Sequence, residues 1–288
     1  MPSSAKASCP VVVDRGTVRA ARRLTGALLV LMAAQSSAGL LFPGQYRDGE
    51  WIKAAWFGND WVTLAVATPL MAAALVREGQ PSTRPLLVWA GTVAYAIYNY
   101  HFYLFGAALS VFFPLYVTAV VLSIIILILL LGHVDGAAVA RRFRPETPIR
   151  TIGGFFVFVG GGLAIVWLTM WAAYVFADRP TPVDTAAFKI VAALDLALMV
   201  PALTCGGVLL WNRRPWGFVL ASVAGLQGAL YLIVLSVNSV VAIRRGLTAA
   251  PGELPFWAPL VIATSAATGL LLANVRDLPC ESQNEVRS

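Results

Sequence analysis

The sequence predicts an all-α integral membrane protein, a bundle of eight transmembrane helices, from three observations. The first is composition, because 59% of the 288 residues are hydrophobic and only 12% are charged, against about 25% charged in soluble proteins. The second is that the charges form short islands between long tracts that hold one carboxylate, Asp195, and no lysine or arginine. The third is length, because a helix needs about 20 apolar residues to cross a hydrocarbon core roughly 30 Å thick.

Seven such tracts occur, and the third, residues 85–134, is 50 residues long and must cross twice. Only helices that satisfy their own backbone hydrogen bonds can do so. They form one transmembrane domain, 24–274, between a basic N-terminal tail, 1–23, and a C-terminal tail, 275–288. The expected spans are 24–42, 60–76, 85–108, 112–132, 151–177, 186–211, 216–243 and 255–274.

The first span admits two interpretations. Basic residues precede it, and the small residues of Ala34–Gly39 follow its apolar start, as in a cleavable signal peptide. The apolar stretch nevertheless continues to Phe42, which is long enough to cross a bilayer. We therefore expect a retained helix, with cleavage as the alternative.

Two loops are long. The outer loop, Pro43–Asp60, carries Trp51, Trp56 and Phe57 at helical spacing, which favours an amphipathic helix lying in the membrane interface. The inner loop, 133–150, is basic and separates two groups of four spans. This division suggests a weak four-plus-four repeat, of the kind on which many transporters are built.

The later spans contain packing and kink signals. Small residues four apart, such as Gly160 with Ala164 and Ala221 with Gly225, predict close contact between helices. Pro201 lies within the sixth span and is expected to kink it, because proline has no backbone N–H to donate.

The basic residues predict the orientation. If the N-terminus is cytoplasmic, the inner segments hold 15 of the 21 lysines and arginines, as the positive-inside rule requires. We therefore expect both termini in the cytoplasm and the chain in the plasma membrane. The net charge of +7 follows from this topology, so no nucleic-acid partner is expected. The excess of arginine over lysine, 18 to 3, indicates a bacterial source with a GC-rich genome.

Asp195 is the central candidate site residue. It lies about nine residues into the sixth span, about 13 Å deep, where a carboxylate costs about 2.5–3.5 kcal/mol and needs a partner. On a helical wheel it shares a face with Ala192, Met199 and Gly206, so it should point into the bundle. It would be either a proton- or cation-binding group or a hydrogen-bonded carboxyl that locks helices together.

His101 lies at a similar depth in the third span, within the aromatic run 95–103. An Asp195–His101 pair would offer a proton relay, and a histidine bonded to a nearby carbonyl is the favoured alternative. The helical wheel places Asn99 with Tyr95 and Tyr98, on the side of the helix opposite His101.

Further polar residues are expected at about the same level of the bilayer. Together they would form a small outer-facing cavity that binds or transports a small solute or ion, beyond what helix packing alone requires. The candidate solute- or proton-binding residues are Asp195, His101, Asn99, Asn238, Gln227, Tyr231 and Gln35.

Signatures of catalysis are sparse. The sequence has no metal-ligand spacing, phosphate loop or G-x-S-x-G motif, so we expect no cofactor and lean against an enzyme. A second hypothesis is a non-catalytic membrane component, such as an assembly, sensor or partner subunit that uses the inner loop Arg141–Arg150. An intramembrane enzyme is the third. Transport predicts one continuous polar cavity, whereas a structural role predicts polar groups that are satisfied singly inside packed interfaces.

Overall fold

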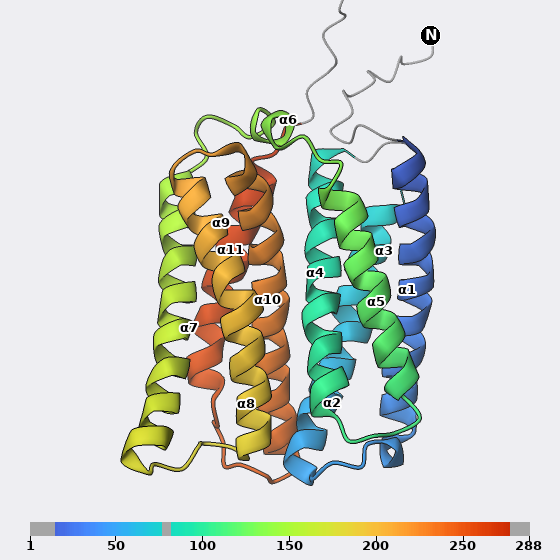
Figure 1. The fold of residues 1–288 in the computed structure, drawn as a ribbon, viewed down its shortest axis with the longest axis vertical. Coiled ribbons are helices and arrows are strands. Elements are labelled where there is room, and N and C mark those ends of the chain that lie inside the picture. Colours follow the sequence, from blue (N-terminus) through green and yellow to red (C-terminus); the bar gives the residue numbers. More distant parts are fainter. Residues whose placement is uncertain (1–14, 77–81, 277–288) are drawn as a thin grey trace, which may run out of the picture.

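The computed structural model describes residues 15–76 and 82–276. It is 82% helical, and the described residues contain no strand beyond an isolated bridge between Phe143 and Val275. The predicted all-α class is therefore confirmed. Most helices lie side by side along one long axis, and the chain runs back and forth between the two ends (Figure 1).

From the third predicted span onward, the helical segments begin and end within two residues of their predicted bounds. The helices are α1 (Arg15–Leu41), α2 (Glu50–Val62), α3 (Thr68–Leu75), α4 (Thr83–Gly106), α5 (Phe113–Leu131), α6 (Gly136–Ala140), α7 (Ile149–Ala177), α8 (Thr185–Leu194), α9 (Val200–Trp211), α10 (Pro215–Arg244) and α11 (Leu254–Ala273).

The first two helices begin earlier than predicted. Helix α1 starts at Arg15, so the last part of the predicted basic tail is helical, while residues 1–14 and 277–288 lie outside the described residues. The second helical segment starts at Glu50 instead of residue 60. The charges of both regions predict boundaries, but arginines and a buried carboxylate can continue a helix when their heads reach water or hydrogen-bond partners.

The predicted interfacial helix in Pro43–Asp60 is instead the beginning of α2, which enters the bundle. Trp56 and Phe57 are only 0% and 5% exposed, whereas Trp51, near the start of the helix, is 52% exposed. The aromatic spacing was therefore a core pattern of a long helix, because one face of α2 is covered by its neighbours.

Two helical segments contain a π-turn. Residues Thr63–Ala67 join α2 to α3, and residues Asp195–Met199 join α8 to α9. In each, the last residue before a proline donates its N–H to the carbonyl five residues back, Thr68 to Thr63 and Val200 to Asp195. The missing N–H of the following proline favours this local widening, so Pro201 interrupts its helix as expected.

Six of the described helical segments are long and apolar enough to cross a membrane: Gly16–Leu41, Phe113–Leu131, Ile149–Ala177, Thr185–Trp211, Pro215–Arg244 and Leu254–Ala273. Large apolar side chains such as Ile128 and Phe158 are 65% and 72% exposed, as expected for a lipid-facing surface. The chain is therefore a membrane-embedded helical protein. Glu50–Leu75 and α4 are not among these six segments.

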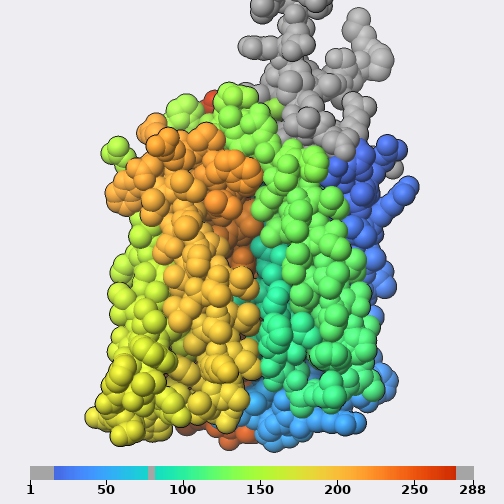
Figure 2. All heavy atoms as spheres, in the orientation of Figure 1, coloured from blue at the N-terminus to red at the C-terminus, as the bar shows by residue number. Residues whose placement is uncertain are grey.

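The helices form two groups, α1–α5 and α7–α11, which lie beside each other (Figure 1). Helix α10 packs against α4 and α2, and α4 also packs against α8, so these helices build the contact between the groups. Figure 2 shows the two groups in contact along their length. We call the end at which α1, α4, α7 and α10 begin the basic end, and the short helix α6 covers it.

Candidate functional site

Asp195 is buried between three other helices and accepts hydrogen bonds from each of them. Its Oδ1 accepts from the hydroxyl of Tyr98 on α4 at 2.6 Å. Its Oδ2 accepts from the indole Nε1 of Trp167 on α7 at 2.8 Å and from the hydroxyl of Tyr231 on α10 at 3.4 Å. The side chain is 1% exposed, so the predicted inward orientation is observed. We call these four residues the Asp195 cluster.

The backbone departs from a regular α-helix at Asp195. Asp195 is the first residue of the π-turn, and π-turns shift the side chains that follow relative to a regular helix. The rings of Tyr98 and Tyr231 also pack on each other, with centroids 4.7 Å apart. The carboxylate forms no ion pair with any described residue, so all its observed partners are neutral donors.

Asp60 forms a second buried cluster, which the sequence interpretation missed. Its Oδ1 accepts from the hydroxyl of Tyr103 at 2.8 Å and from the amide of Gln35 at 3.2 Å, and its Oδ2 accepts from the hydroxyl of Tyr46 at 2.6 Å. Tyr100 donates to the amide oxygen of Gln35 at 3.1 Å. Asp60 is 0% exposed. We call these five residues the Asp60 cluster.

A signal for the Asp60 cluster existed in the sequence. Trp56, Asp60 and Thr63 follow one another at spacings of four and three, which places them on one helical face. Asp60 was instead assigned to the end of a loop, because the uncharged tract begins at Trp61. Gln35 was predicted to be functional, but the structure places it beside Asp60 and not in the Asp195 cluster.

The loop between α1 and α2 covers Asp60. Burial, and then the nearby charge of Asp60, raise the pKa of Tyr46 far above its ordinary value, so its hydroxyl remains a donor. Asp48 holds the same loop in place, because it accepts hydrogen bonds from the indole of Trp56 and from the backbone N–H of Ala108, each at 2.9 Å. The loop is thus joined both to α2 and to the segment after α4.

Helix α4 contributes to both clusters. Tyr98 bonds Asp195, whereas Tyr100 and Tyr103 belong to the Asp60 cluster. Between them, Asn99 donates to the hydroxyl of Thr63 at 3.2 Å, and Thr63 lies 3.0 Å from the Tyr95 hydroxyl. Asn99 is thus linked to Tyr95 through Thr63, whereas Tyr98 bonds Asp195, so the aromatic run of α4 lies between two carboxylates.

His101 does not join either cluster. Its Nδ1 lies 2.7 Å from the carbonyl oxygen of Ile97 on the same helix, and its ring packs near Phe105 at 5.8 Å. The structure thus shows the carbonyl-bonded histidine, and not an Asp195–His101 pair. The helical wheel had already placed His101 on the side of α4 opposite Asn99.

The predicted polar stripe of α10 separates into three environments. Tyr231 belongs to the Asp195 cluster. With its amide nitrogen facing the carbonyls, Asn238 donates to Ala55 of α2 and to Val234, each at 3.1 Å, and so joins the two groups of helices. Gln227 is buried, at 6% exposure, and lies outside both clusters. The single predicted layer is therefore two separate carboxylate clusters and an interhelical contact.

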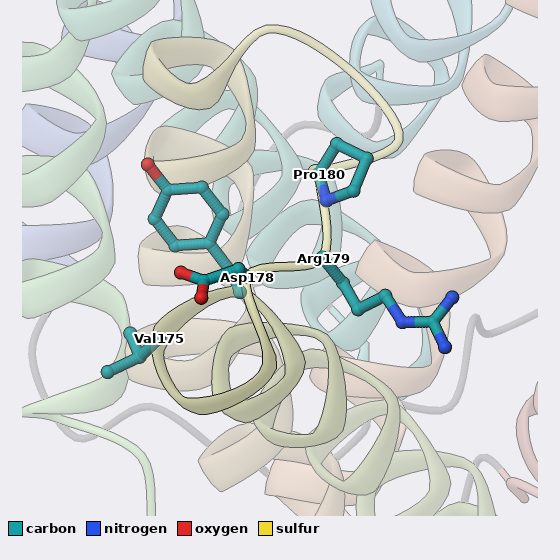
Figure 3. Close-up of a pocket in the computed structure, with 5 residues that line it drawn as sticks. Val175, Asp178, Arg179 and Pro180 are labelled. Atoms are coloured by element: carbon teal, nitrogen blue, oxygen red, sulfur yellow. The ribbon is translucent and has the colours of Figure 1, made fainter.

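A hollow lies at the end of the bundle opposite the basic end. It has a volume of about 490 Å³ and is lined by Tyr174, Val175, Asp178, Arg179 and Pro180. Asp178, where α7 ends, has a left-handed backbone with φ of 49°. The side chains of Asp178 and Arg179 extend to opposite sides (Figure 3), so they do not converge on one ligand position.

The described residues hold no group of three or more histidine, cysteine, aspartate or glutamate side chains placed to bind a metal ion. Comparisons of the chain with protein-family models, with curated proteins and with solved structures find no match.

Proposed function

We propose that the protein crosses a bacterial cytoplasmic membrane eight times and has both termini in the cytoplasm. Six helical segments are apolar enough to cross. The other two, Glu50–Leu75 and the 24-residue α4, are long enough, because 24 residues extend about 36 Å. They are less apolar because they carry Asp60 and the tyrosines that face the bundle interior. The distribution of arginine supports the orientation.

We also infer a four-plus-four repeat in which both halves have the same orientation. Asp60 and Asp195 each lie ten residues after the start of their helical segment, at Glu50 and Thr185. Each segment then contains a π-turn followed by a proline. Two segments with the same sequence of features support a duplication, although the residues themselves differ.

The partners of the carboxylates follow the same scheme. Asp60 accepts from Gln35 on the preceding long helix, α1, and from Tyr103 on the following one, α4. Asp195 accepts from Trp167 on α7 and from Tyr231 on α10, which are the corresponding helices of the second half. Helices α4 and α10 pack together, as expected for a pair that lies beside a pseudo-twofold axis.

The function that this arrangement supports best is transport of a small solute or ion, linked to a proton or cation that binds the buried carboxylates. One observation carries the proposal: two carboxylates, each at most 1% exposed, have only neutral hydrogen-bond donors among the described residues, and each accepts from a different tyrosine of α4. A carboxylate inside a membrane without a basic partner takes a proton or a cation as its counter-ion. Interrupted helices are where transporters place such sites.

A structural role is the alternative, and one observation favours it. Each carboxylate already accepts three hydrogen bonds from side chains, so each could serve only to hold helices together. The protein would then act as a membrane component that binds a partner through the basic segment Arg141–Arg150.

Infrared difference spectroscopy in lipid nanodiscs tests the proposal. The carboxyl C=O band is compared between acidic and alkaline buffer for the wild-type protein, Asp195→Asn and Asp60→Asn. Glu253→Gln is the matched control, because Glu253 is an exposed carboxylate that also accepts from an indole, that of Trp257, at 2.9 Å. Proton flux into liposomes that contain each protein is measured with an internal pH-sensitive dye.

Transport linked to protonation predicts that each Asn variant loses the pH-dependent C=O band of the buried aspartate that it replaces, and that Glu253→Gln retains both of these bands. It also predicts that proton flux falls in both Asn variants. Difference spectra in which neither Asn variant loses a band that Glu253→Gln retains, together with equal flux in all four proteins, would support the structural role instead.

A further inference from the structure

A small pocket lies at the basic end, between the segment after α6 and the turn that joins α9 to α10. Its volume is about 160 Å³. Phe143 and Phe218 form an apolar part of its wall, with ring centroids 4.8 Å apart. Arg144, Arg213 and Thr147 supply its polar part. The pocket is distant along the helices from both carboxylate clusters and is independent of the proposed function.

The charges around this pocket favour an anion. Neither Arg144 nor Arg213 forms an ion pair with a carboxylate of the described residues. Two carboxylates of the described residues at this end have other partners: Glu146 pairs with Arg276 at 3.3 Å, and Asp135 accepts from the first backbone N–H groups of α6. Arg144 and Arg213 therefore line the pocket, and no carboxylate of the described residues pairs with either of them.

Two long helices begin beside the pocket and add to this preference. Ile149, the first residue of α7, and Phe218, in the first turn of α10, both line it. Neither helix has a side-chain cap or an acidic residue in its first turn. The dipole of a helix places partial positive charge at its start, so both helix starts add to the effect of the arginines, although the N–H of Ile149 donates to Thr147 and that of Gly217 to Arg214.

Arg213 occupies an unusual backbone position. Its φ is 55°, in the left-handed region where a residue other than glycine costs about 1–2 kcal/mol. The turn that contains it is held by backbone bonds from Arg213 to Leu210 and from Arg214 to Leu209, each 2.9 Å. A position where glycine would be less strained thus carries an arginine that lines the pocket.

We infer that this pocket binds the phosphate of an anionic phospholipid headgroup. Its level in the bilayer fits, because Trp211 and Trp216, which flank the turn, are 48% and 41% exposed, and exposed tryptophans mark the headgroup region. Val208, one helical turn further into the membrane, is 47% exposed and offers apolar surface to an acyl chain. Basic pockets between membrane helices bind such headgroups.

Native mass spectrometry of the full chain in detergent tests the inference. Binding of dioleoylphosphatidylglycerol and of dioleoylphosphatidylcholine is measured for the wild-type protein and for the double variant R144Q/R213Q. Loss of two arginine–phosphate contacts is expected to weaken phosphatidylglycerol binding about thirtyfold, with little change for phosphatidylcholine. The control R141Q/R150Q removes the same charge from exposed arginines of the same end that do not line the pocket, and should retain tight binding.

The variant Arg213→Gly separates binding from folding. Glycine suits the left-handed backbone, so this variant should melt no lower than wild type without lipid, while it binds phosphatidylglycerol more weakly. Equal loss of binding in R144Q/R213Q and R141Q/R150Q would overturn the inference, because general surface charge would then explain the binding. Inorganic phosphate that binds as tightly as the lipid, and is lost in R144Q/R213Q, would overturn the lipid as the source of the phosphate.

Discussion

At the scale of single residues, the buried carboxylates show what one sequence can and cannot predict. Helical periodicity oriented Asp195 correctly, because periodicity depends only on its own helix. Its partners Tyr98 and Trp167 were not predicted, since they are 97 and 28 residues away and periodicity does not order helices in space. Depth alone suggested an Asp195–His101 pair, whereas the favoured alternative, a histidine bonded to a nearby carbonyl, is what the structure shows.

The Asp60 cluster offers a matched test of one hydrogen bond. Tyr46 and Tyr116 are both buried tyrosines, 2% and 1% exposed, but only Tyr46 donates to Asp60, whereas the Tyr116 hydroxyl has no partner among the described residues. Tyr46→Phe should therefore destabilise the protein by about 1–3 kcal/mol, the cost of an unmade buried bond. Tyr116→Phe should be close to neutral. Thermal unfolding in detergent measures both, and equal melting temperatures would contradict the assignment.

The Asp195–Trp167 bond has an exposed counterpart in the chain. A double-mutant cycle with Asp195→Asn and Trp167→Phe should give a coupling of about 1 kcal/mol or more, because both groups are in contact away from water. The same cycle with Glu253→Gln and Trp257→Phe, whose bond is also short but exposed, should give a coupling near zero. Similar couplings for the two pairs would show that burial adds nothing to the Asp195 contact.

At the scale of helices, the predicted bounds agree closely from the third span onward, whereas α1 also includes the arginines between Arg15 and Arg23 that were expected in the tail. The predicted bounds fail at α2 because Glu50, Lys53 and Asp60 are inside a helix. Glu50 pairs with Lys53 at 2.9 Å at the start of α2, and Asp60 is satisfied by tyrosines and an amide, so these charges do not end the helix. The π-turns were beyond prediction, since Pro201 indicates an interruption but not its geometry.

A close approach of α7 and α9 at two glycines gives a prediction at this scale. A Cβ added at Gly207 would lie 2.6 Å from the carbonyl oxygen of Gly153, so Gly207→Ala must separate two backbones and should destabilise by about 1–3 kcal/mol. A Cβ at Gly161, on α7, would meet nothing within 4 Å, and Gly161→Ala should be neutral or stabilising by up to about 1 kcal/mol. Melting temperatures in detergent that rank the variants in the opposite order would contradict this packing.

At the scale of the whole molecule, the number of spans depends on whether Glu50–Leu75 and α4 cross the membrane. Ser82, just before α4, is the discriminating position, because it is cytoplasmic with eight spans and external with six. In a variant without the natural cysteines, Ser82→Cys should react with a membrane-impermeant maleimide only after cells are permeabilised. Leu109→Cys, in the loop before α5, should react in intact cells. Labelling of Ser82→Cys in intact cells would contradict eight spans.

The hydrogen bonds by which Asp48 holds its loop over the Asp60 cluster affect the rate at which Asp60 can exchange a proton. The loop before α2 is held over Asp60 by the bonds of Asp48 to Trp56 and Ala108 and by the Tyr46–Asp60 bond, so any opening of this loop must break all three. The opening frequency of this loop, and not the strength of the carboxylate as an acid, would then set how fast Asp60 exchanges its proton with the medium. Asp195 has no loop residue among its donors, so the two carboxylates should exchange on different timescales.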